Sequence, residues 1–339
     1  MRRRSFLSLL PAMALPLPLS AAETVKPQRL KPGDTVGLVA PSSNAWEDED
    51  IRFGIETVES LGYKVKAGRH LFSRTDYLAG SDEERAADLQ AAFEDDAVDA
   101  VFCIRGGYGA QRILPYLDFD AIGKNPKILL GFSDITALLG SIQRRTGLVT
   151  FHGPTALRTW SEYALGGLRK VLVEPSAPVR LAEPPPFEAR PGKVERENRL
   201  TTIVGGKARG KLAGGNLTLL STLLGTPYAP DFTGKILFIE DVDESPYRID
   251  RMLTHLWLAG VFEACAAVAV GKFTESKPGS GRSRSLEEIL RDRLEPLGKP
   301  ALRGLMIGHV DDLATIPVGA EAELDADAGT LTLLETAVT

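Results

Sequence analysis

Apolar and polar stretches alternate along residues 31–155 in a way that predicts a parallel sheet with helices. Short apolar runs are each followed by a segment with helical spacing, often with acidic residues in its first turn. Repeated strand–helix–strand units of this length are typical of a doubly wound α/β domain. The expected strands span residues 35–41, 63–68, 98–104, 127–132 and 147–152, and the expected helices span residues 46–62, 82–95, 110–118 and 134–143.

The pattern changes beyond residue 155. Six prolines between Pro175 and Pro191 predict an extended linker over residues 156–192. A second, smaller α/β domain with a β-rich closing segment is expected over residues 193–339. Its expected elements are a glycine-rich turn and helix at 212–225, strands at 235–240, 267–273 and 305–309, helices at 247–260 and after Ser285, a loop at 276–285, and a hairpin at 321–335.

Residues 1–22 have the pattern of a secretory signal. Three arginines precede an apolar stretch from Phe6 to Leu19, and small residues follow at Ser20-Ala21-Ala22. The stretch is too short and too rich in proline to span a membrane, so no stable membrane insertion is expected. The segment from Arg3 to Leu7 also fits the twin-arginine export pattern. We therefore expect a mature chain that begins near Glu23 and is periplasmic or otherwise exported.

Charge and cysteine content narrow the range of partners. The formal net charge is -5, and removal of three arginines with the signal would leave about -8. Nucleic acids and anionic membranes select basic surfaces, so neither is expected as the main partner.

The two cysteines, Cys103 and Cys265, stand in apolar runs. They are expected to be small buried hydrophobic residues rather than a disulfide, and they form no metal-ligand pair.

Four loops of the first domain should share one edge of the sheet, because ligands bind beyond the carboxyl ends of parallel strands. One of them, RGGYGAQR from Arg105, fits neither the dinucleotide motif nor the phosphate-binding loop. Its glycines favour a loop whose N–H groups face a substrate oxygen, with a plain turn as the alternative. The four loops are residues 41–43, 105–109, 133–134 and 152–154.

Ser133 stands where an apolar run changes to helical spacing. One interpretation is a helix N-cap, and the other is a nucleophile held on a tight turn between strand and helix. The match to G-x-S-x-G is partial, because Gly131 is present but Ile135 occupies the place of the second glycine. This window alone favours the N-cap.

A serine nucleophile also needs a base and an orienting carboxylate. Glu240 and His309 each end a predicted strand of the second domain, so both are candidates. His152 ends a strand on the shared edge of the first domain. The other two histidines are expected to be structural, namely His70 and His255.

The acidic run 240–244, together with His309, offers an alternative as a set of ligands for a divalent metal. The spacings H-E-x-x-H and H-x-x-E-H are both absent from the chain. Acidic residues after a strand also commonly cap the next helix. A metal site is therefore not the favoured interpretation.

Six ordered segments resemble the LD-carboxypeptidase family, whose members include muramoyltetrapeptide carboxypeptidases. The resemblance runs from about Lys31 to Glu335. The segments are RGGYGAQRIL, GFSDITALL, FHGP, GGNLTLLSTLLGTP, LFIEDVDESPYRIDRML and IGHVDDLATIPVGAEAELD. The resemblance implies that Ser133 is the nucleophile, Glu240 the orienting carboxylate and His309 the base. It therefore favours the nucleophile over the N-cap.

The resemblance also implies the reaction. A serine carboxypeptidase of this kind hydrolyses the L,D peptide bond before a C-terminal D-amino acid, such as D-alanine, in muropeptides derived from the cell wall. The active site is expected in the cleft between the domains, with no metal and no cofactor. The partner is a small peptide, and self-association as a homodimer is an open expectation. The export signal departs from the family, because members that recycle cell-wall peptides are generally cytoplasmic.

Binding residues follow from the same reaction. The N–H of Asp134, with that of Gly106 or Gly107, would receive the oxyanion. An exopeptidase also needs a partner for the free carboxylate of its substrate. Arg105 is the expected partner unless it pairs with a carboxylate of the protein itself, and Arg248 is the second candidate.

Two other functions stay open. One is a related peptidase or amidase that acts on another peptide conjugate, of the antibiotic-resistance type, and the other is a periplasmic solute-binding protein.

Overall fold

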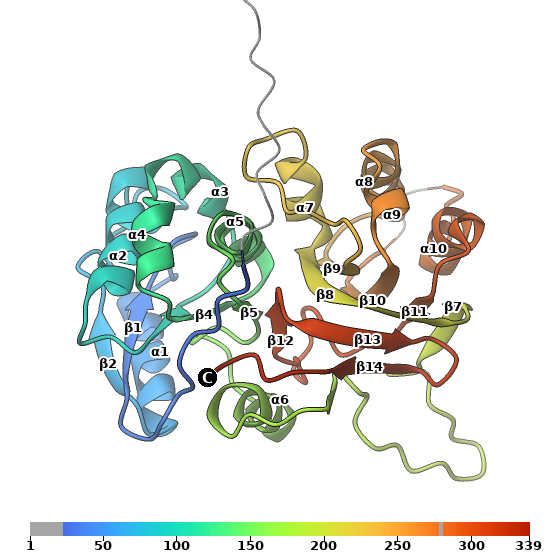
Figure 1. Cartoon of the computed structure of the whole chain (residues 1–339), viewed down its shortest axis with the longest axis horizontal. Helices are drawn as coiled ribbons and strands as arrows, with labels where there is room; N and C mark the ends of the chain where they lie inside the picture. The colour runs from blue at the N-terminus through green and yellow to red at the C-terminus, as the bar shows by residue number, and fades with distance from the viewer. Residues whose placement is uncertain (1–22, 278–280) are drawn as a thin grey trace, which may run out of the picture.

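The computed structural model describes residues 23–277 and 281–339, and in this part of the chain it contains two sheets that lie side by side (Figure 1). The first is a six-stranded sheet with the order β12-β5-β4-β3-β1-β2. Its strands are β1 (Thr35–Val39), β2 (Lys64–Ala67), β3 (Ala100–Cys103), β4 (Ile128–Gly131), β5 (Thr150–His152) and β12 (Ile316–Val318).

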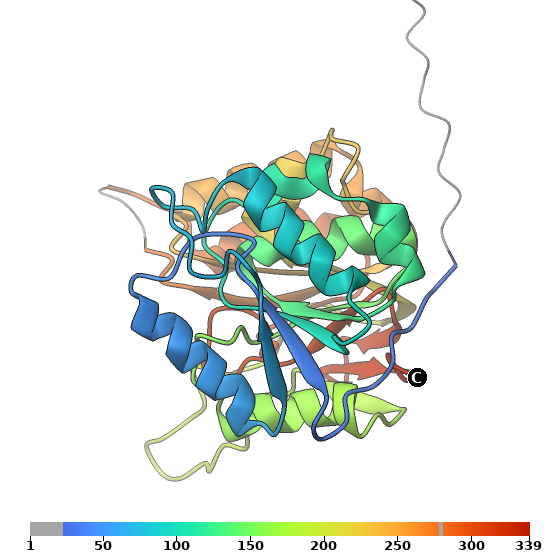
Figure 2. The ribbon, with the colours of Figure 1, turned by 90° about the vertical axis from the view of Figure 1, so that its left-hand side faces the viewer.

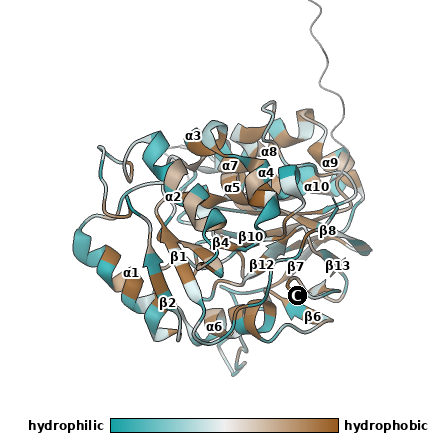
Figure 3. Cartoon of the chain, turned by 60° about the vertical axis from the view of Figure 1, so that its left-hand side comes forward, coloured by the Kyte–Doolittle hydropathy of each residue, from teal (hydrophilic) through white to brown (hydrophobic). Residues whose placement is uncertain are grey.

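Strands β1 to β5 are parallel, which confirms the predicted doubly wound arrangement. Figure 2 shows α1 on one side of this sheet and the helices after β2 and β3 on the other. Apolar residues concentrate on the strands, whereas α1 alternates apolar and polar positions (Figure 3). The helices of this domain are α1 (Asp48–Ser60), α2 (Asp82–Glu94), α3 (Ala110–Ile113), α4 (Phe119–Lys124) and α5 (Thr136–Thr146).

The second sheet has eight strands in the described residues, in the order β6-β14-β13-β8-β9-β10-β11-β7. Helices α7 to α10 cover one of its faces (Figure 1). The strands are β6 (Val179–Leu181), β7 (Thr201–Val204), β8 (Lys207–Asn216), β9 (Ile236–Val242), β10 (Ala267–Thr274), β11 (Ala301–Arg303), β13 (Glu321–Asp325) and β14 (Thr330–Leu333). The helices of this part are α6 (Glu162–Leu168), α7 (Leu217–Leu223), α8 (Pro246–Leu258), α9 (Val261–Ala264) and α10 (Leu286–Leu294).

Helix capping follows the sequence pattern closely. In the capping box of α2, the Ser81 hydroxyl accepts from the N–H of Glu84 at 3.2 Å, and the Glu84 carboxylate accepts from the N–H of Ser81 at 2.9 Å. The same reciprocal pair opens α10 with Ser285 and Glu288. Each box satisfies two N–H groups that a helix start leaves without partners.

The two sheets are not independent units. Strand β12 comes from the C-terminal part of the chain but pairs antiparallel with β5 of the first sheet. Along β9, Ile236 and Phe238 join the apolar cluster that continues into the first domain, whereas Leu237 and Ile239 pack under helices α7 to α10. Because successive strand residues face opposite sides, β9 ties the shared core to the helical layer.

Residues 156–192 differ from the extended linker that the prolines predict. This segment contains α6, an irregular helical turn over Arg169–Val173, and β6, which is the edge strand of the second sheet. Leu168, Val171 and Leu172 are buried at helical spacing, so apolar burial orders the chain before the prolines begin.

Two further expectations are corrected. Residues 305–309 do not form a strand but a bent loop that follows β11, with Gly308 at φ 129°. Residues 212–216, expected as a glycine-rich turn, belong to β8, and the helix expected after them is α7, which begins at Leu217. The closing hairpin is confirmed as β13 and β14, and both cysteines are free and buried.

In the residues that the structure describes, no helix has both the length and the apolar character needed to cross a membrane.

Candidate active site

Ser133 occupies a sharp turn between β4 and α5. Phe132 is still extended, at φ -150°, and Ser133 then takes a left-handed conformation at φ 62°. This backbone region is costly for a residue with a side chain, and it is found mostly at functional sites. The Ser133 side chain does not cap α5, because its Oγ bonds to His309 instead. The N-cap interpretation is therefore wrong.

His309 connects Ser133 to a buried carboxylate. Its Nε2 lies 3.0 Å from Ser133 Oγ, and its Nδ1 lies 2.8 Å from Glu240 Oε2. Both distances are those of good hydrogen bonds. Since an ionised carboxylate can only accept, Nδ1 carries the proton and Nε2 is left to accept from the hydroxyl. The structure thus brings the three residues expected from the sequence into one hydrogen-bonded chain.

Glu240 is fully buried in β9, two residues before the strand ends, directly beside the loop that carries His309. A side chain at Gly308 would put its Cβ 3.0 Å from Glu240 Oε2, and the positive φ of Gly308 also disfavours other residues. Glycine therefore lets the loop approach closely enough for the imidazole to meet the carboxylate.

Aromatic side chains pack against the imidazole of His309. The His309 ring is tilted against Phe132 with centroids 4.8 Å apart, and Phe132 in turn meets the edge of His152 at 5.9 Å. His152 is fully buried, and within the described residues neither of its ring nitrogens has a hydrogen-bond partner. Burial, assisted by the nearby His309, lowers the pKa of His152 to about 3. His152 thus lies on the expected edge but stays neutral and outside the hydrogen-bonded chain.

The glycine loop lies directly against the Ser133 turn. A Cβ built on Gly106 would be 3.1 Å from Ser133 Cβ and 3.2 Å from the backbone nitrogen of Asp134. The next residue, Gly107, has φ 116° and packs on Ser43. Absence of a side chain at position 106 leaves space above the N–H of Asp134, where a small oxygen could be bound.

The carboxylate of Asp134 holds three of the predicted loops together. It accepts from the Ser42 hydroxyl at 2.6 Å and from the N–H of Ala110 at 2.7 Å, and it is almost fully buried. Burial raises the pKa of Asp134, although both hydrogen bonds act in the opposite direction. The predicted convergence of loops 41–43, 105–109 and 133–134 is confirmed.

The two arginines expected at the site are placed differently. Arg105 donates from Nη1 to the backbone oxygen of Asn44 at 3.0 Å, and within the described residues it pairs with no carboxylate. Arg248 is exposed on α8, where its Nε donates to the Tyr247 hydroxyl. Whether either one binds substrate stays a prediction.

Two groups near the site were not predicted. Arg158, in the segment read as linker, places its guanidinium 5.4 Å from the centre of the Phe132 ring. Asp241 accepts from Asn216 Nδ2 at 2.9 Å and from the N–H of Thr218 at 3.0 Å, which fixes the end of β9 against α7. Burial and the neighbouring Glu240 raise the pKa of Asp241. The acidic run after the strand was visible, but its hydrogen-bond partners were not.

The side chains of the acidic run 240–244 and His309 are not arranged as a metal site in the described residues. Across residues 23–277 and 281–339, no three side chains of the metal-binding types gather closely enough to hold an ion. Asp241 faces Asn216 and Thr218, whereas Glu240 faces His309.

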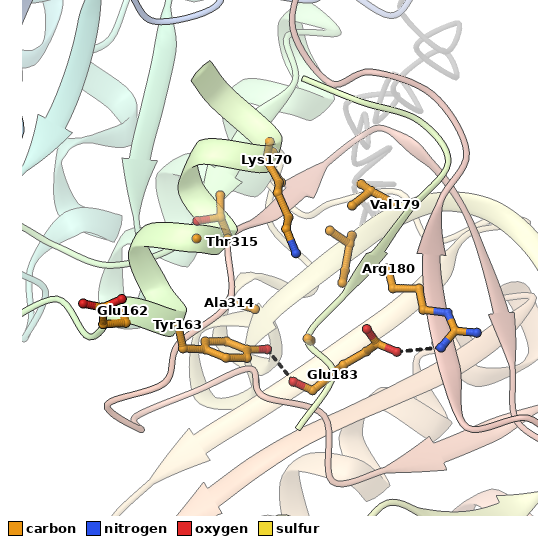
Figure 4. Close-up of a pocket in the computed structure, with 13 residues that line it drawn as sticks. Glu162, Tyr163, Lys170, Val179, Arg180, Glu183, Ala314 and Thr315 are labelled. Atoms are coloured by element: carbon orange, nitrogen blue, oxygen red, sulfur yellow. Dashed lines mark hydrogen bonds and ion pairs between the residues drawn. The ribbon is translucent and has the colours of Figure 1, made fainter. Parts of the chain in front are cut away.

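A hollow next to the Ser133 turn is lined by both domains. The first domain contributes the glycine loop, α3 and Asp134, and the second contributes α7 through Thr218, Leu219 and Thr222. A separate hollow lies between α6, β6 and Thr315 (Figure 4), where Tyr163 donates to the backbone oxygen of Glu183 at 2.7 Å. Ser133, Glu240 and His309 do not line that second hollow.

Comparison with known families agrees with this geometry. Residues 36–153 match the LD-carboxypeptidase N-terminal domain, and residues 209–324 match the LD-carboxypeptidase C-terminal domain. The chain belongs to the LD-carboxypeptidase family. It is thus a hydrolase of the serine peptidase class, as its resemblance to the family implies.

Named relatives cover nearly the whole chain. A probable murein peptide carboxypeptidase of Bacillus subtilis is 42% identical over 301 residues, which are 88% of this chain and 91% of the relative. The murein tetrapeptide carboxypeptidase of Pseudomonas aeruginosa is 34% identical over 86% of this chain and 93% of its own. The microcin C7 self-immunity protein MccF of Escherichia coli is 31% identical over 89% and 94%.

Solved structures show the same fold. MccF in complex with glutamyl sulfamoyl guanosine superposes with a TM-score of 0.84 at 27% identity, over 93% of this chain and 99% of that chain. The muramoyltetrapeptide carboxypeptidase of Oxalobacter formigenes superposes with a TM-score of 0.76 at 30% identity, over 90% and 100%.

Proposed function

We propose that the protein hydrolyses the L,D peptide bond before a C-terminal D-amino acid, such as D-alanine, in muropeptides derived from the cell wall. The observation that carries the proposal is the hydrogen-bonded chain from Ser133 through His309 to Glu240. The murein peptide and murein tetrapeptide carboxypeptidases among the relatives support this substrate class.

The proposed reaction is acyl transfer through Ser133. His309 Nε2 accepts the hydroxyl proton while Oγ attacks the carbonyl carbon, and a tetrahedral intermediate forms. Glu240 holds the imidazole in the required tautomer and stabilises the imidazolium. His309 then gives the proton to the leaving amine, which departs as the free D-amino acid, and a water molecule hydrolyses the acyl-enzyme by the same route.

The oxyanion of the intermediate would be bound at the glycine loop. The expected donors are the N–H of Asp134, which follows the nucleophile directly, and the N–H of Gly106 or Gly107 in the glycine loop that packs against the Ser133 turn. Each such donor contributes roughly 3–4 kcal/mol to transition-state stabilisation in enzymes of this kind. The residues of the chain supply every step, so the proposed mechanism uses no cofactor.

A second candidate is cleavage of a peptide conjugate by the same residues. The superposition on MccF, solved with glutamyl sulfamoyl guanosine, favours this alternative. The two candidates share the nucleophile and differ in the peptide conjugate that is cleaved.

The first prediction concerns the nucleophile. Ser133→Ala should lower kcat by roughly 10⁴-fold or more, because removal of a triad member leaves only the contribution of binding and the oxyanion donors. Turnover is measured by mass spectrometry as loss of one terminal residue from muropeptide tetrapeptides. Ser60→Ala, at the exposed end of α1, is the matched control and should keep full activity. Activity of Ser133→Ala within tenfold of the wild type would contradict the serine mechanism.

The second prediction concerns the oxyanion space. Gly106→Ala should lower kcat by roughly 10²-fold with a smaller effect on KM, because its methyl group fills the space over the N–H of Asp134. Gly123→Ala is the control, since a Cβ there meets only ordinary contacts with Thr146. Gly123→Ala should unfold near the wild-type temperature, whereas Gly106→Ala should unfold at a lower temperature, because its Cβ would lie 3.1 Å from Phe132 O and from Ser133 Cβ. If Gly106→Ala keeps its kcat, the oxyanion is bound elsewhere.

The third prediction concerns location. Residues 1–22 lie outside the described residues, so the export signal rests on the sequence alone. We propose that it is cleaved and that the enzyme acts outside the cytoplasm. N-terminal sequencing of the native protein should find a chain that begins near Glu23. An intact Met1 on a cytoplasmic pool would refute the proposal.

Self-association of the protein as a homodimer stays a prediction.

A further inference from the structure

The proposed reaction places the leaving residue on the side of His309. The imidazole that accepts the Ser133 proton must later donate it to the leaving amine, so that nitrogen lies within hydrogen-bond reach of His309 Nε2. In a C-terminal residue the carboxylate carbon is only two bonds, about 2.5 Å, from the same nitrogen. The group that recognises the free carboxylate therefore belongs near His309, and this inference rests on the proposed function.

Arg158 is the arginine that meets this condition. Its guanidinium lies 5.4 Å from the centre of the Phe132 ring, and the His309 ring packs against the same Phe132 at 4.8 Å. Arg158 also reaches the His309 loop directly, because its Nη2 lies 3.3 Å from Asp311 Oδ1. The cation is thus held on the ring of Phe132, which also packs on the imidazole, and on the loop that carries His309.

The guanidinium of Arg158 still has N–H donors that could bind a ligand. Its only ion-pair partner in the described residues, Asp311, has a side chain that is 95% exposed, and such exposed pairs are weak. A guanidinium has five N–H donors in a planar fork that matches a carboxylate. Arg105, in contrast, belongs to the glycine loop and already donates to the backbone of Asn44.

We propose that Arg158, rather than Arg105, binds the carboxylate of the leaving residue. A free carboxylate transferred from water into a site without a cation would lose its hydration without compensation. A planar fork beside His309 supplies that compensation and holds the leaving amine toward Nε2. Arg158 would thereby make the enzyme an exopeptidase.

The fourth prediction tests this with two substrates, a tetrapeptide with a free C-terminus and its C-terminal amide. Arg158→Gln should raise KM for the free acid at least tenfold and change KM for the amide little, because only the acid uses the guanidinium. Asp311→Asn removes the ion pair but keeps the arginine, so it should retain the preference for the acid. Arg105→Lys should affect both substrates equally.

Equal loss on both substrates in Arg158→Gln would overturn the assignment, as would a loss of acid preference in Arg105→Lys alone. If the wild-type enzyme cleaves neither peptide, the proposed function fails and the assignment falls with it. Ser133→Ala cleaves neither by design, so it sets the background rate.

A second, independent observation is a group of exposed aromatic side chains near the glycine loop. Trp46 is 87% exposed, Tyr77 59% and Tyr108 53%, and the two tyrosine rings meet edge to face at 5.7 Å. Trp46 and Tyr77 line one hollow together with polar side chains. The hollow is lined by Ser43, Asn44, Ala45, Trp46, Asp76, Tyr77 and Arg105.

Hydrogen bonds connect this aromatic hollow to the catalytic loops. Ser43 Oγ accepts from the N–H of Tyr108 at 3.0 Å, and Asn44 Nδ2 donates to the backbone oxygen of Asp76 at 3.1 Å. Gly107, which packs on Ser43, follows the glycine that faces the Ser133 turn. No residue of the His309 loop lines the hollow. It is therefore assigned to the part of the substrate that stays on the enzyme as the acyl group.

We infer that the aromatic hollow binds a sugar ring attached to the acyl end of the peptide. Exposed aromatic faces pack against the apolar faces of pyranose rings, and amide, carboxylate and guanidinium groups pair with hydroxyl and acetamido groups. A relative with the same fold is named a muramoyltetrapeptide carboxypeptidase, and that name includes a sugar on the peptide. This inference also rests on the proposed function.

The fifth prediction compares a disaccharide tetrapeptide with the same tetrapeptide without sugar. Trp46→Ala should raise KM at least fivefold for the sugar-bearing substrate and leave KM for the free peptide unchanged, with kcat retained on both. Tyr77→Ala should act in the same direction. Trp257→Ala is the control, because Trp257 is an exposed tryptophan on α8 that does not line the hollow.

Equal KM for both substrates in the wild type and in Trp46→Ala would overturn the sugar assignment without touching the proposed function. Failure of the wild type on both substrates would overturn both. Since Trp46 is mostly solvent-exposed, its replacement should leave the unfolding temperature unchanged, so a rise in KM would report weaker substrate binding.

Discussion

The hydrogen bond between Ser133 Oγ and His309 Nε2 joins the two sheets, and the arrangement of the site depends on it. Ser133 follows β4 of the first sheet, whereas Glu240 lies in β9 and His309 in the loop after β11 of the second. A bond of 3.0 Å tolerates little relative movement of the two units. The structure meets this demand by sharing its core: β12 leaves the C-terminal part to pair with β5, and Ile316 of β12 lies beside His152.

Much of this architecture could be predicted from the sequence, because strands, caps and strand ends are local features. The apolar runs and capping boxes located β1 to β5 and the start of α2, and they placed Ser133 directly after β4 and Glu240 near the end of the apolar strand β9. They also singled out His309, although its segment is a loop rather than the expected strand. The local window could not distinguish a capping serine from a nucleophile. The resemblance to the family, which the comparisons confirm, separates the two, and so do the positive φ of Ser133 and the hydrogen bond between its Oγ and His309.

What could not be predicted depends on contacts between distant parts of the chain. Strand β12 is three residues long and pairs with a strand more than 150 residues earlier, so no local periodicity marks it. The loop of residues 305–309 is apolar enough to resemble a strand, but Gly308 bends it toward Glu240. Arg158 stood in a segment read as linker, and its importance appears only when Phe132 and Asp311 are placed beside it.

The surroundings of Glu240 explain why the hydrogen-bonded chain would favour the transition state over the ground state. Glu240 is fully buried, and its Oε1 has no hydrogen-bond partner among the described residues, so the carboxylate is incompletely compensated while His309 is neutral. When His309 accepts the Ser133 proton, the imidazolium supplies a charge next to that carboxylate in a poorly screened environment. A second imidazolium at His152 would oppose this change, but burial lowers the pKa of His152 to about 3 and keeps that ring neutral. In the proposed reaction the attraction between Glu240 and His309 is therefore strongest only after proton transfer, which is the condition for an interaction to accelerate the chemical step.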